Sequence, residues 1–215
     1  MDSKTLSTVI SVLGKKYHVK LEKEDPFEIL IHGILSTRTK DTTTFPAQAR
    51  LLKVAGTPDK IVKLDTHRIE KLIYPVGFYK TKAKHLKSAC RVLLDRFGGE
   101  VPDNKEDLLM IPGVGHKVAS LVLVWGFGLP YVPVDTHVNR ISKRLGVVQD
   151  NRKPERTQIV LESMLSDRLR IIANHTLVQF GRDICKPMSP QCYRCPVYEY
   201  CEYKNKAFYR NRQSK

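Results

Sequence analysis

Apolar residues along this chain recur mainly at every third or fourth position, and few segments alternate as a half-buried strand would. One apolar face contains Phe27, Leu30, Ile31, Ile34 and Leu35. Because a helix brings such positions to one side, this spacing predicts amphipathic helices. The same reading predicts helices around residues 4–14, 43–54, 66–74, 86–97, 137–145, 155–166 and 170–182. The pattern therefore predicts an all-α fold.

Glycine and proline separate the predicted helices. The apolar face that ends at Phe97 is followed by Gly98-Gly99, a common signal for the end of a helix. Prolines interrupt the pattern at positions 26, 58, 75, 102, 130, 133 and 154. The sequence of 215 residues shows no internal repeat and no long linker, and its length allows one large domain or two small ones.

The charge balance indicates what such a helical protein binds. Lysine and arginine number 37 against 22 aspartates and glutamates, which gives a formal net charge of +15. Such a field attracts polyanions, so nucleic acid is the first candidate partner; a basic protein without that partner is the plainer alternative. With 41% hydrophobic and 27% charged residues, the composition is that of a globular protein and excludes a disordered tail.

No segment is a candidate for export or membrane insertion. The N-terminal stretch MDSKTLSTVISVLGKK lacks a long apolar core, and nowhere do about 18 uncharged apolar residues follow one another. We therefore expect an intracellular protein without a membrane partner, in a compartment where thiols stay reduced.

The stretch IPGVGHKVAS, residues 111–120, contains a glycine-rich turn between two predicted helices. The first helix, within DNKEDLLM, would be capped by Asp103 or Asn104, and the second lies within GHKVASLVLVWG. Gly113 and Gly115 allow positive φ angles and the close approach of another molecule's backbone. The turn thus has the features of a binding loop as well as of a connection.

The start of the second helix has the properties of an anion site. Its free N–H groups and positive dipole end would accept a DNA phosphate beside Val114 and His116. A plain tight turn between packed helices is the alternative. The fuller pattern L-x-x-(I/L)-P-G-V-G-x-K-x-A, however, matches the helix–hairpin–helix motif of DNA repair proteins.

Two residues near this turn are candidates for catalysis. Lys117 lies in the first turn of the second helix, where the positive dipole end favours a neutral, nucleophilic amine. A phosphate-contacting lysine is the alternative. Asp135, in VPVDTHVNR, would cap the next helix. Capping and catalysis are compatible, because hydrogen bonds from the helix N–H groups keep the carboxylate ionised.

Four cysteines in the last 31 residues indicate a metal centre. Cys185, Cys192, Cys195 and Cys201 are separated by six, two and five residues. Zinc is the general alternative, but zinc ribbons usually pair two C-x2-C knuckles and only one is present here. A reducing compartment disfavours disulfides. The fifth cysteine, Cys90, lies on an apolar helix face and is expected to be a buried small hydrophobe.

The stretch LMIPGVGHKVASLVLVWGFGLPYVPVDTHVNR resembles the endonuclease III family of base-excision DNA glycosylases. The blocks ILSTRTKD, VGFYKTKAKHL and GGEVP are similar to the family as well, and the resemblance runs from about residue 26 to about residue 205. It implies that Lys117 is the nucleophile and Asp135 its essential partner. It also implies one four-iron four-sulfur cluster, since the family uses the spacing C-x6-C-x2-C-x5-C for this cofactor.

The resemblance implies two helical domains with a DNA-binding cleft between them. A helical barrel domain would span residues 22–130 and contain the helix–hairpin–helix motif at about 104–125. The iron–sulfur domain would combine residues 1–21 and 131–215. The expected partner is double-stranded DNA containing damaged bases or abasic sites, and a monomer is the family's default state.

Five further residues are expected to contact DNA. Phe78, where the family often has leucine, would fill the gap left by an extruded base, although core packing is its alternative role. Arg38, where many members have glutamine, would fill the same gap or bond the orphan base. His137 could reach a phosphate, and Lys186 and Arg194 would contact phosphates from the loops around the cluster unless they are ordinary solvated charges.

The implied enzyme is bifunctional and removes damaged pyrimidines, with oxidised bases as the usual substrates. Lys117 attacks C1′, the base leaves, and an imine with the sugar forms. That imine acidifies the C2′ hydrogens, so the 3′ phosphate is eliminated and the strand is nicked. The alternatives are a mismatch uracil or thymine glycosylase that leaves the strand intact, a non-catalytic iron–sulfur DNA-binding module, and a zinc-stabilised nuclease.

Overall fold

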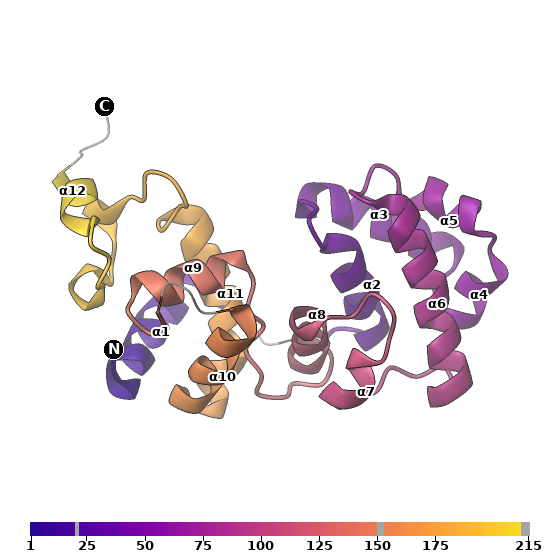
Figure 1. Ribbon diagram of the computed structural model, residues 1–215, viewed down its shortest axis with the longest axis horizontal. Helices are drawn as coiled ribbons and strands as arrows, with labels where there is room; N and C mark the ends of the chain where they lie inside the picture. The colour runs from indigo at the N-terminus through magenta and orange to yellow at the C-terminus, as the bar shows by residue number, and fades with distance from the viewer. Residues whose placement is uncertain (20–21, 150–152, 212–215) are drawn as a thin grey trace. The chain divides into compact units, whose positions relative to one another are not determined.

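The computed structural model describes residues 1–19, 22–149 and 153–211. Its regular elements in these ranges are all α, 3-10 or π helices, which confirms the all-α prediction. The chain divides into two compact units, one formed by Met1–Leu21 with Pro130–Lys215 and the other by Glu22–Leu129 (Figure 1). The first unit thus combines segments from both ends of the sequence.

The Glu22–Leu129 unit is organised around one long helix. Its elements are α2 (Pro26–Ser36), α3 (Asp41–Val54), α4 (Pro58–Lys63), α5 (Thr66–Ile73), α6 (Tyr79–Phe97), α7 (Lys105–Leu109), α8 (His116–Leu121) and the π turn η1 (Val122–Gly126). Helices α2, α4 and α5 pack against α6, while α3 packs on α2 and α5. Helices α7 and α8 form the hairpin, and α8 rests on α2.

Local chemistry sets where these helices begin and end. The Oδ1 atom of Asp25 accepts hydrogen bonds from the N–H groups of Phe27 and Glu28 at 2.8 and 3.0 Å, and Pro26 occupies the first turn of α2. At the other end of the unit's longest helix, Gly98 has a φ of 63° and terminates α6. The predicted stop at Gly98-Gly99 is confirmed.

The core of this unit is the predicted apolar face of α2 packed on α6. Leu30, Ile31 and Leu35 have no exposed surface, and Ile34 is 2% exposed. Cys90 of α6 is fully buried, as predicted for a small hydrophobe, and burial raises the pKa of its thiol to about 12. Cys90 is therefore protonated and inert.

Three short elements differ from the sequence prediction. Helix α4 was not predicted, since its six residues include a single buried side chain, Ile61, and so show no apolar period. Helix α12 (Lys206–Asn211) was not predicted for the same reason, because no residue in it is buried. The predicted helix through Trp125 is interrupted, since α8 gives way to the wider η1 at Val122.

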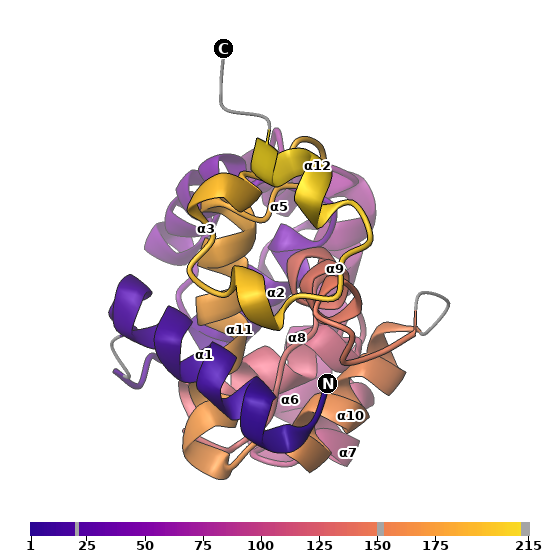
Figure 2. The ribbon, with the colours of Figure 1, turned by 90° about the vertical axis from the view of Figure 1, so that its left-hand side faces the viewer.

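The second unit is a small bundle with an irregular C-terminal segment. Its elements are α1 (Ser3–Tyr17), α9 (Thr136–Arg144), α10 (Pro154–Met164), α11 (Asp167–Asp183), the 3-10 turns η2 (Cys192–Arg194) and η3 (Tyr198–Tyr200), and α12. Helices α1 and α9 pack on α11 around a core that includes Leu6, Ile10, Val138, Ile141, Leu177 and Phe180. Figures 1 and 2 place α12 at the opposite end of this unit from α10. Of the helices described, none is both long and apolar enough to cross a membrane.

Candidate functional site

The hairpin begins with a capped helix and turns at a glycine with positive φ. Asn104 caps α7, because its Oδ1 accepts the N–H of Asp107 at 2.9 Å, which decides between the two predicted caps. Gly113 has a φ of 86°, and a Cβ there would lie 3.0 Å from the Cβ of His85 on α6. Glycine is therefore required at this position both by conformation and by space.

Gly115 serves a different purpose from Gly113. Its φ is −106°, so Gly115 does not use the positive φ that glycine permits. A Cβ built on Gly115 meets nothing within 4 Å, and no side chain caps the start of α8. Val114 is buried and anchors the turn, while His116 is exposed. The start of α8 at Gly115 therefore borders open space.

Lys117 is positioned by close packing between α8 and α2. It is half-buried in the first turn of α8. A Cβ on Gly33 of α2 would lie only 2.5 Å from the Cγ1 of Val118, so glycine lets the two helix backbones approach. The charge of Lys117 acts on His32 of α2, a residue that was not predicted from the sequence.

His32 is held in a fixed orientation in this neighbourhood. Its Nδ1 lies 2.9 Å from the Oε1 of Gln48, and its ring packs on Phe45 with centroids 4.6 Å apart. Burial lowers the pKa of His32, and the charge of Lys117 lowers it further. The hydrogen bond to Gln48 and the charge of Asp41 act in the opposite direction and raise this pKa. The available sequence signal was a single histidine within the apolar stretch of residues 29–35.

Asp135 is the N-cap of α9, as predicted. Its Oδ1 accepts the N–H of Val138 at 2.8 Å, and its side chain is half-buried. Asp135 belongs to the unit with both chain ends, whereas Lys117 belongs to Glu22–Leu129. Their predicted partnership in catalysis remains a proposal.

Arg38 and Phe78 lie together, although 40 positions separate them in the sequence. The guanidinium of Arg38 stands over the Phe78 ring, 5.9 Å from its centroid. Both residues have left-handed backbone, with φ values of 52° and 58°. The Phe78 side chain is 63% exposed, so the alternative of core packing is wrong.

Beneath this pair lies Lys82, a buried lysine that the sequence analysis also missed. Lys82 is 5% exposed, and its Nζ donates to Leu35 O at 2.7 Å, Thr37 O at 2.6 Å and Thr39 Oγ1 at 3.0 Å. Burial lowers the pKa of this ammonium to about 8. Its position one turn before Leu86, on the apolar face of α6, was the available signal.

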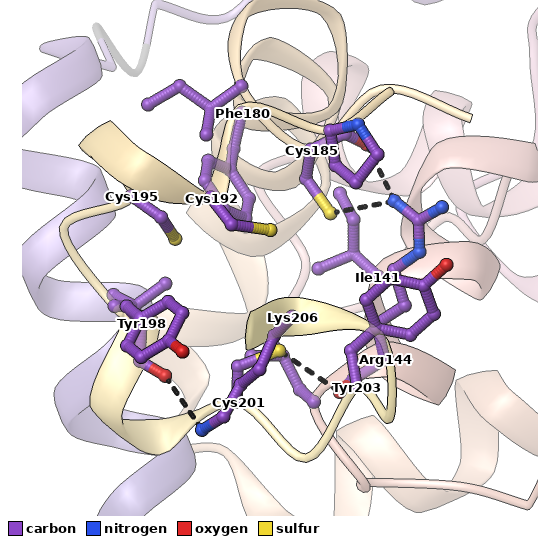
Figure 3. A pocket seen from close by; sticks show the side chains of 14 residues that line it. Ile141, Arg144, Phe180, Cys185, Cys192, Cys195, Tyr198, Cys201, Tyr203 and Lys206 are labelled. Atoms are coloured by element: carbon purple, nitrogen blue, oxygen red, sulfur yellow. Dashed lines mark hydrogen bonds between the residues drawn. The ribbon is translucent and has the colours of Figure 1, made fainter. Parts of the chain in front are cut away.

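All four predicted cysteine ligands line one pocket in the first unit (Figure 3). Cys185 follows α11, Cys192 begins η2, and Cys195 and Cys201 follow the two 3-10 turns. Burial raises the pKa of Cys192, of Cys201 and of Cys195, the last to about 12, and the neighbouring thiols raise each of them further. Four thiolates in this pocket would therefore need cationic partners.

Two arginines of α9 hold the cysteine segment. Arg140 donates to the carbonyl of Cys185 at 2.9 Å. Arg144 donates to the Cys185 sulfur at 3.3 Å and to the carbonyl of Lys186 at 2.7 Å, and its own carbonyl accepts from the Cys201 thiol at 3.3 Å. The helix capped by Asp135 is thus joined directly to two of the four cysteines.

The four cysteines provide a donor set for a metal centre, because all four line one pocket. Among the residues that the structure describes, no group of three or more His, Cys, Asp or Glu side chains is arranged to hold one metal ion. In a four-iron cluster each of four cysteines binds a different iron. Four thiols around a pocket that Arg144 and Lys206 also line fit such an anionic cluster.

The remaining predicted DNA contacts are partly engaged within the protein. The Nδ1 of His137 accepts from Arg140 at 3.2 Å, and burial lowers the pKa of His137. Arg194 forms an ion pair with Asp183 at 2.5 Å. Lys186 is half-buried beside the cysteine pocket. For these three residues, DNA contact stays a prediction.

Comparison with known proteins defines the class of this protein. Residues 31–166 match the family described as HhH-GPD superfamily base excision DNA repair protein. The chain is 41% identical to endonuclease III of Thermotoga maritima over 92% of this chain and 90% of that protein. The chain belongs to the endonuclease III family of DNA glycosylase/AP lyases.

Solved structures agree with this assignment. A trapped endonuclease III–DNA covalent intermediate matches with a TM-score of 0.89 and 31% identity, covering 97% of this chain and 99% of the other. A thermostable thymine-DNA glycosylase matches with a TM-score of 0.86 and 25% identity over 94% and 98% of the two chains. The fold is therefore shared by enzymes described with different activities.

Proposed function

We propose that this protein removes damaged pyrimidines, oxidised ones foremost, from double-stranded DNA and then nicks the strand at the abasic site. The observation that carries this proposal is the position of Lys117, in the first turn of a helix that starts beside open space at the hairpin. The similarity to an endonuclease III trapped covalently on DNA supports the same chemistry.

The hairpin and the paired loops would hold the DNA. N–H groups of the first turn of α8 dock a phosphate beside Gly115, where open space admits the DNA backbone. Arg38 and Phe78 enter the gap left by the extruded nucleotide, because they are exposed and adjacent. Lys186 and Arg194 supply further phosphate contacts around the cysteine segment, with Arg194 exchanging its partner Asp183 for phosphate.

The reaction would follow from one amine and one carboxylate. The neutral amine of Lys117 forms a bond to C1′ as the bond from C1′ to the base breaks, and the base leaves with a proton. The bond between C1′ and the ring oxygen then breaks, the oxygen takes the remaining proton of the nitrogen, and an imine joins Lys117 to C1′. Loss of a C2′ proton breaks the bond between C3′ and its phosphate. Asp135 stabilises the positive charge that grows on the sugar and accepts the proton of Lys117.

The four cysteines would hold a four-iron four-sulfur cluster. A bound cluster supplies a rigid centre of negative charge that fixes the surrounding loops. Arg144 donates directly to one of the ligand sulfurs, while Lys206 borders the pocket and donates to the carbonyl of Tyr198 at 3.2 Å. Both cations would offset the charge of the cluster.

A mismatch thymine or uracil glycosylase is the second candidate, favoured by the match to the thermostable thymine-DNA glycosylase. Such an enzyme would release its base and leave the strand intact. Duplexes that each carry one defined lesion and opposing base separate the two candidates. We expect a nicked product and, with borohydride, a covalent enzyme–DNA adduct; base release without either would favour the mismatch enzyme.

Lys117→Ala tests the assignment of the nucleophile. The variant should form no borohydride adduct and no nick, yet should fold and bind abasic duplex, because Lys117 is half-buried in a helix's first turn. Lys84→Ala, which removes an exposed lysine amine of α6, is the matched control and should keep the adduct. An adduct formed by Lys117→Ala would assign the nucleophile to another amine.

A further inference from the structure

Lys82 carries a positive charge into the interior of the Glu22–Leu129 unit. Its three hydrogen-bond acceptors are two carbonyls and one hydroxyl, all of them neutral. Burying an ammonium without an anionic partner is unfavourable, because neutral oxygens replace its hydration only in part. A methionine or leucine would pack on this face without that penalty. The charge at this position therefore calls for an explanation beyond packing.

The three acceptors belong to the segment that carries Arg38. Leu35 lies in the last turn of α2, while Thr37 and Thr39 are the two neighbours of Arg38. The ammonium thus binds the carbonyl of Thr37, before Arg38, at 2.6 Å, and the hydroxyl of Thr39, after Arg38, at 3.0 Å. Fixing both neighbours fixes the left-handed backbone of Arg38 between them.

The same contacts extend to Phe78 through Thr39. The Thr39 hydroxyl oxygen, which Lys82 binds, also accepts the N–H of Gly77 at 3.2 Å. On the other side of Phe78, the N–H of Lys82 donates to the Phe78 carbonyl at 3.0 Å. The segment of Arg38 and the turn of Phe78 are therefore joined around one lysine.

We propose that Lys82 is a positioning residue that joins the loop of Arg38 to the turn of Phe78, so that both side chains enter damaged DNA as one preformed unit. This inference rests on the proposed function and deepens it. Left-handed backbone is unfavourable for both residues and persists only where the surroundings hold it. A preformed pair inserts without the entropy loss of ordering two separate loops on DNA.

The test compares Lys82→Met with Lys80→Met. Methionine keeps the length of Lys82 and removes its charge and donors, while Lys80, exposed on the same helix, loses an equal charge. The probe is a duplex with a tetrahydrofuran abasic analogue opposite 2-aminopurine, whose fluorescence rises when the orphan base is unstacked. Binding to this duplex and to an undamaged duplex gives the selectivity for the gap.

We expect the selectivity of Lys82→Met for the gap to fall by about tenfold, because the variant lacks one or two charge-assisted hydrogen bonds. The variant should also lose most of the fluorescence rise. Lys80→Met should keep both. Equal weakening on the two duplexes, or an unchanged fluorescence rise in a folded Lys82→Met protein, would overturn the proposal. Failure of the wild-type protein to form a borohydride adduct with a natural abasic site would instead contradict the proposed function.

A second variant protects the test against loss of folding. Thr39→Val removes the oxygen that joins Lys82 to Gly77 and keeps the shape of the side chain. If Lys82→Met does not fold, Thr39→Val should still show reduced selectivity and a reduced fluorescence rise. If Thr39→Val gave wild-type values in both measurements, the proposal that Lys82 joins the two segments would be wrong.

Discussion

At the scale of single residues, Asp135 has two roles that one pair of substitutions separates. Asparagine caps a helix about as well as aspartate, so Asp135→Asn should melt near the wild-type temperature. It should nevertheless lose base release in single turnovers, because a neutral amide does not stabilise a cationic sugar. Asp135→Ala should lose activity and about 1 kcal/mol of stability. Full activity of the Asn variant would reduce Asp135 to a cap.

Lys82 gives the stability of the protein a pH dependence of defined sign. Its pKa is about 8 in the folded chain and about 10.4 when unfolded, so the unfolded chain holds more protons between these values. The free energy of unfolding should therefore rise with pH in that window, by at most about 1.4 kcal/mol per pH unit. Denaturant titrations from pH 7.5 to 9.5 should show this rise relative to Lys82→Met. Parallel curves for the two proteins would contradict it.

Residue roles were predictable where their causes are local. The caps at Asn104 and Asp135 depend on the next three residues, and the sequence shows these directly. Lys82 and His32 were missed because their partners come from other helices; Leu35, for example, lies 47 positions before Lys82. Periodicity identifies a buried face but cannot show which oxygens a charged side chain on that face will meet.

At the scale of elements, the two hairpin glycines should respond differently to substitution. Gly113→Ala should destabilise the protein by about 1–2 kcal/mol, because alanine resists a φ of 86° and would press on His85. Gly115→Val should leave the melting temperature unchanged, since nothing lies within 4 Å of a Cβ there. It should weaken binding to lesion and undamaged duplexes alike. A loss confined to lesion DNA would place the hairpin in the recognition pocket.

The cysteine segment should carry iron. We expect a coloured protein with about four irons per chain, measured by metal analysis and visible absorption after anaerobic handling. Cys192→Ser should lose iron and solubility together, because the segment around it is mostly irregular and α12 buries no residue. Cys90→Ala removes a thiol outside the pocket and should keep the iron. One zinc per chain without iron would support the zinc alternative.

Long elements were predictable and short ones were not. Helices such as α6 and α11 show several turns of apolar spacing, whereas α4 buries one side chain and α12 none. Helix α12 instead contacts the Tyr198 ring through two cations, with Lys206 and Arg210 lying 4.7 and 4.4 Å from its centroid. Such contacts leave no period in the sequence.

At the scale of the whole molecule, the charge of +15 should dominate binding to undamaged DNA. Each phosphate that the protein neutralises releases counterions, so affinity should fall by about tenfold or more between 50 and 200 mM salt. Fluorescence anisotropy with an undamaged duplex measures this directly. A flat response would mean that the basic residues do not contact the phosphates.

The boundary between the two units, in contrast, was inferred from family resemblance, since composition changes little across it.

Helix α9 also constrains how this sequence can change over time. Asp135 stands at its start, and Arg140 and Arg144 hold Cys185 from its last two turns. An insertion of one residue would rotate the two arginines by about 100° around the helix axis relative to the Asp135 carboxylate. The arginines and the carboxylate could then no longer both keep their present contacts. The length of α9, nine residues, is therefore more constrained than the identity of its side chains that contact neither site. Insertions should be absent here long after substitutions have accumulated.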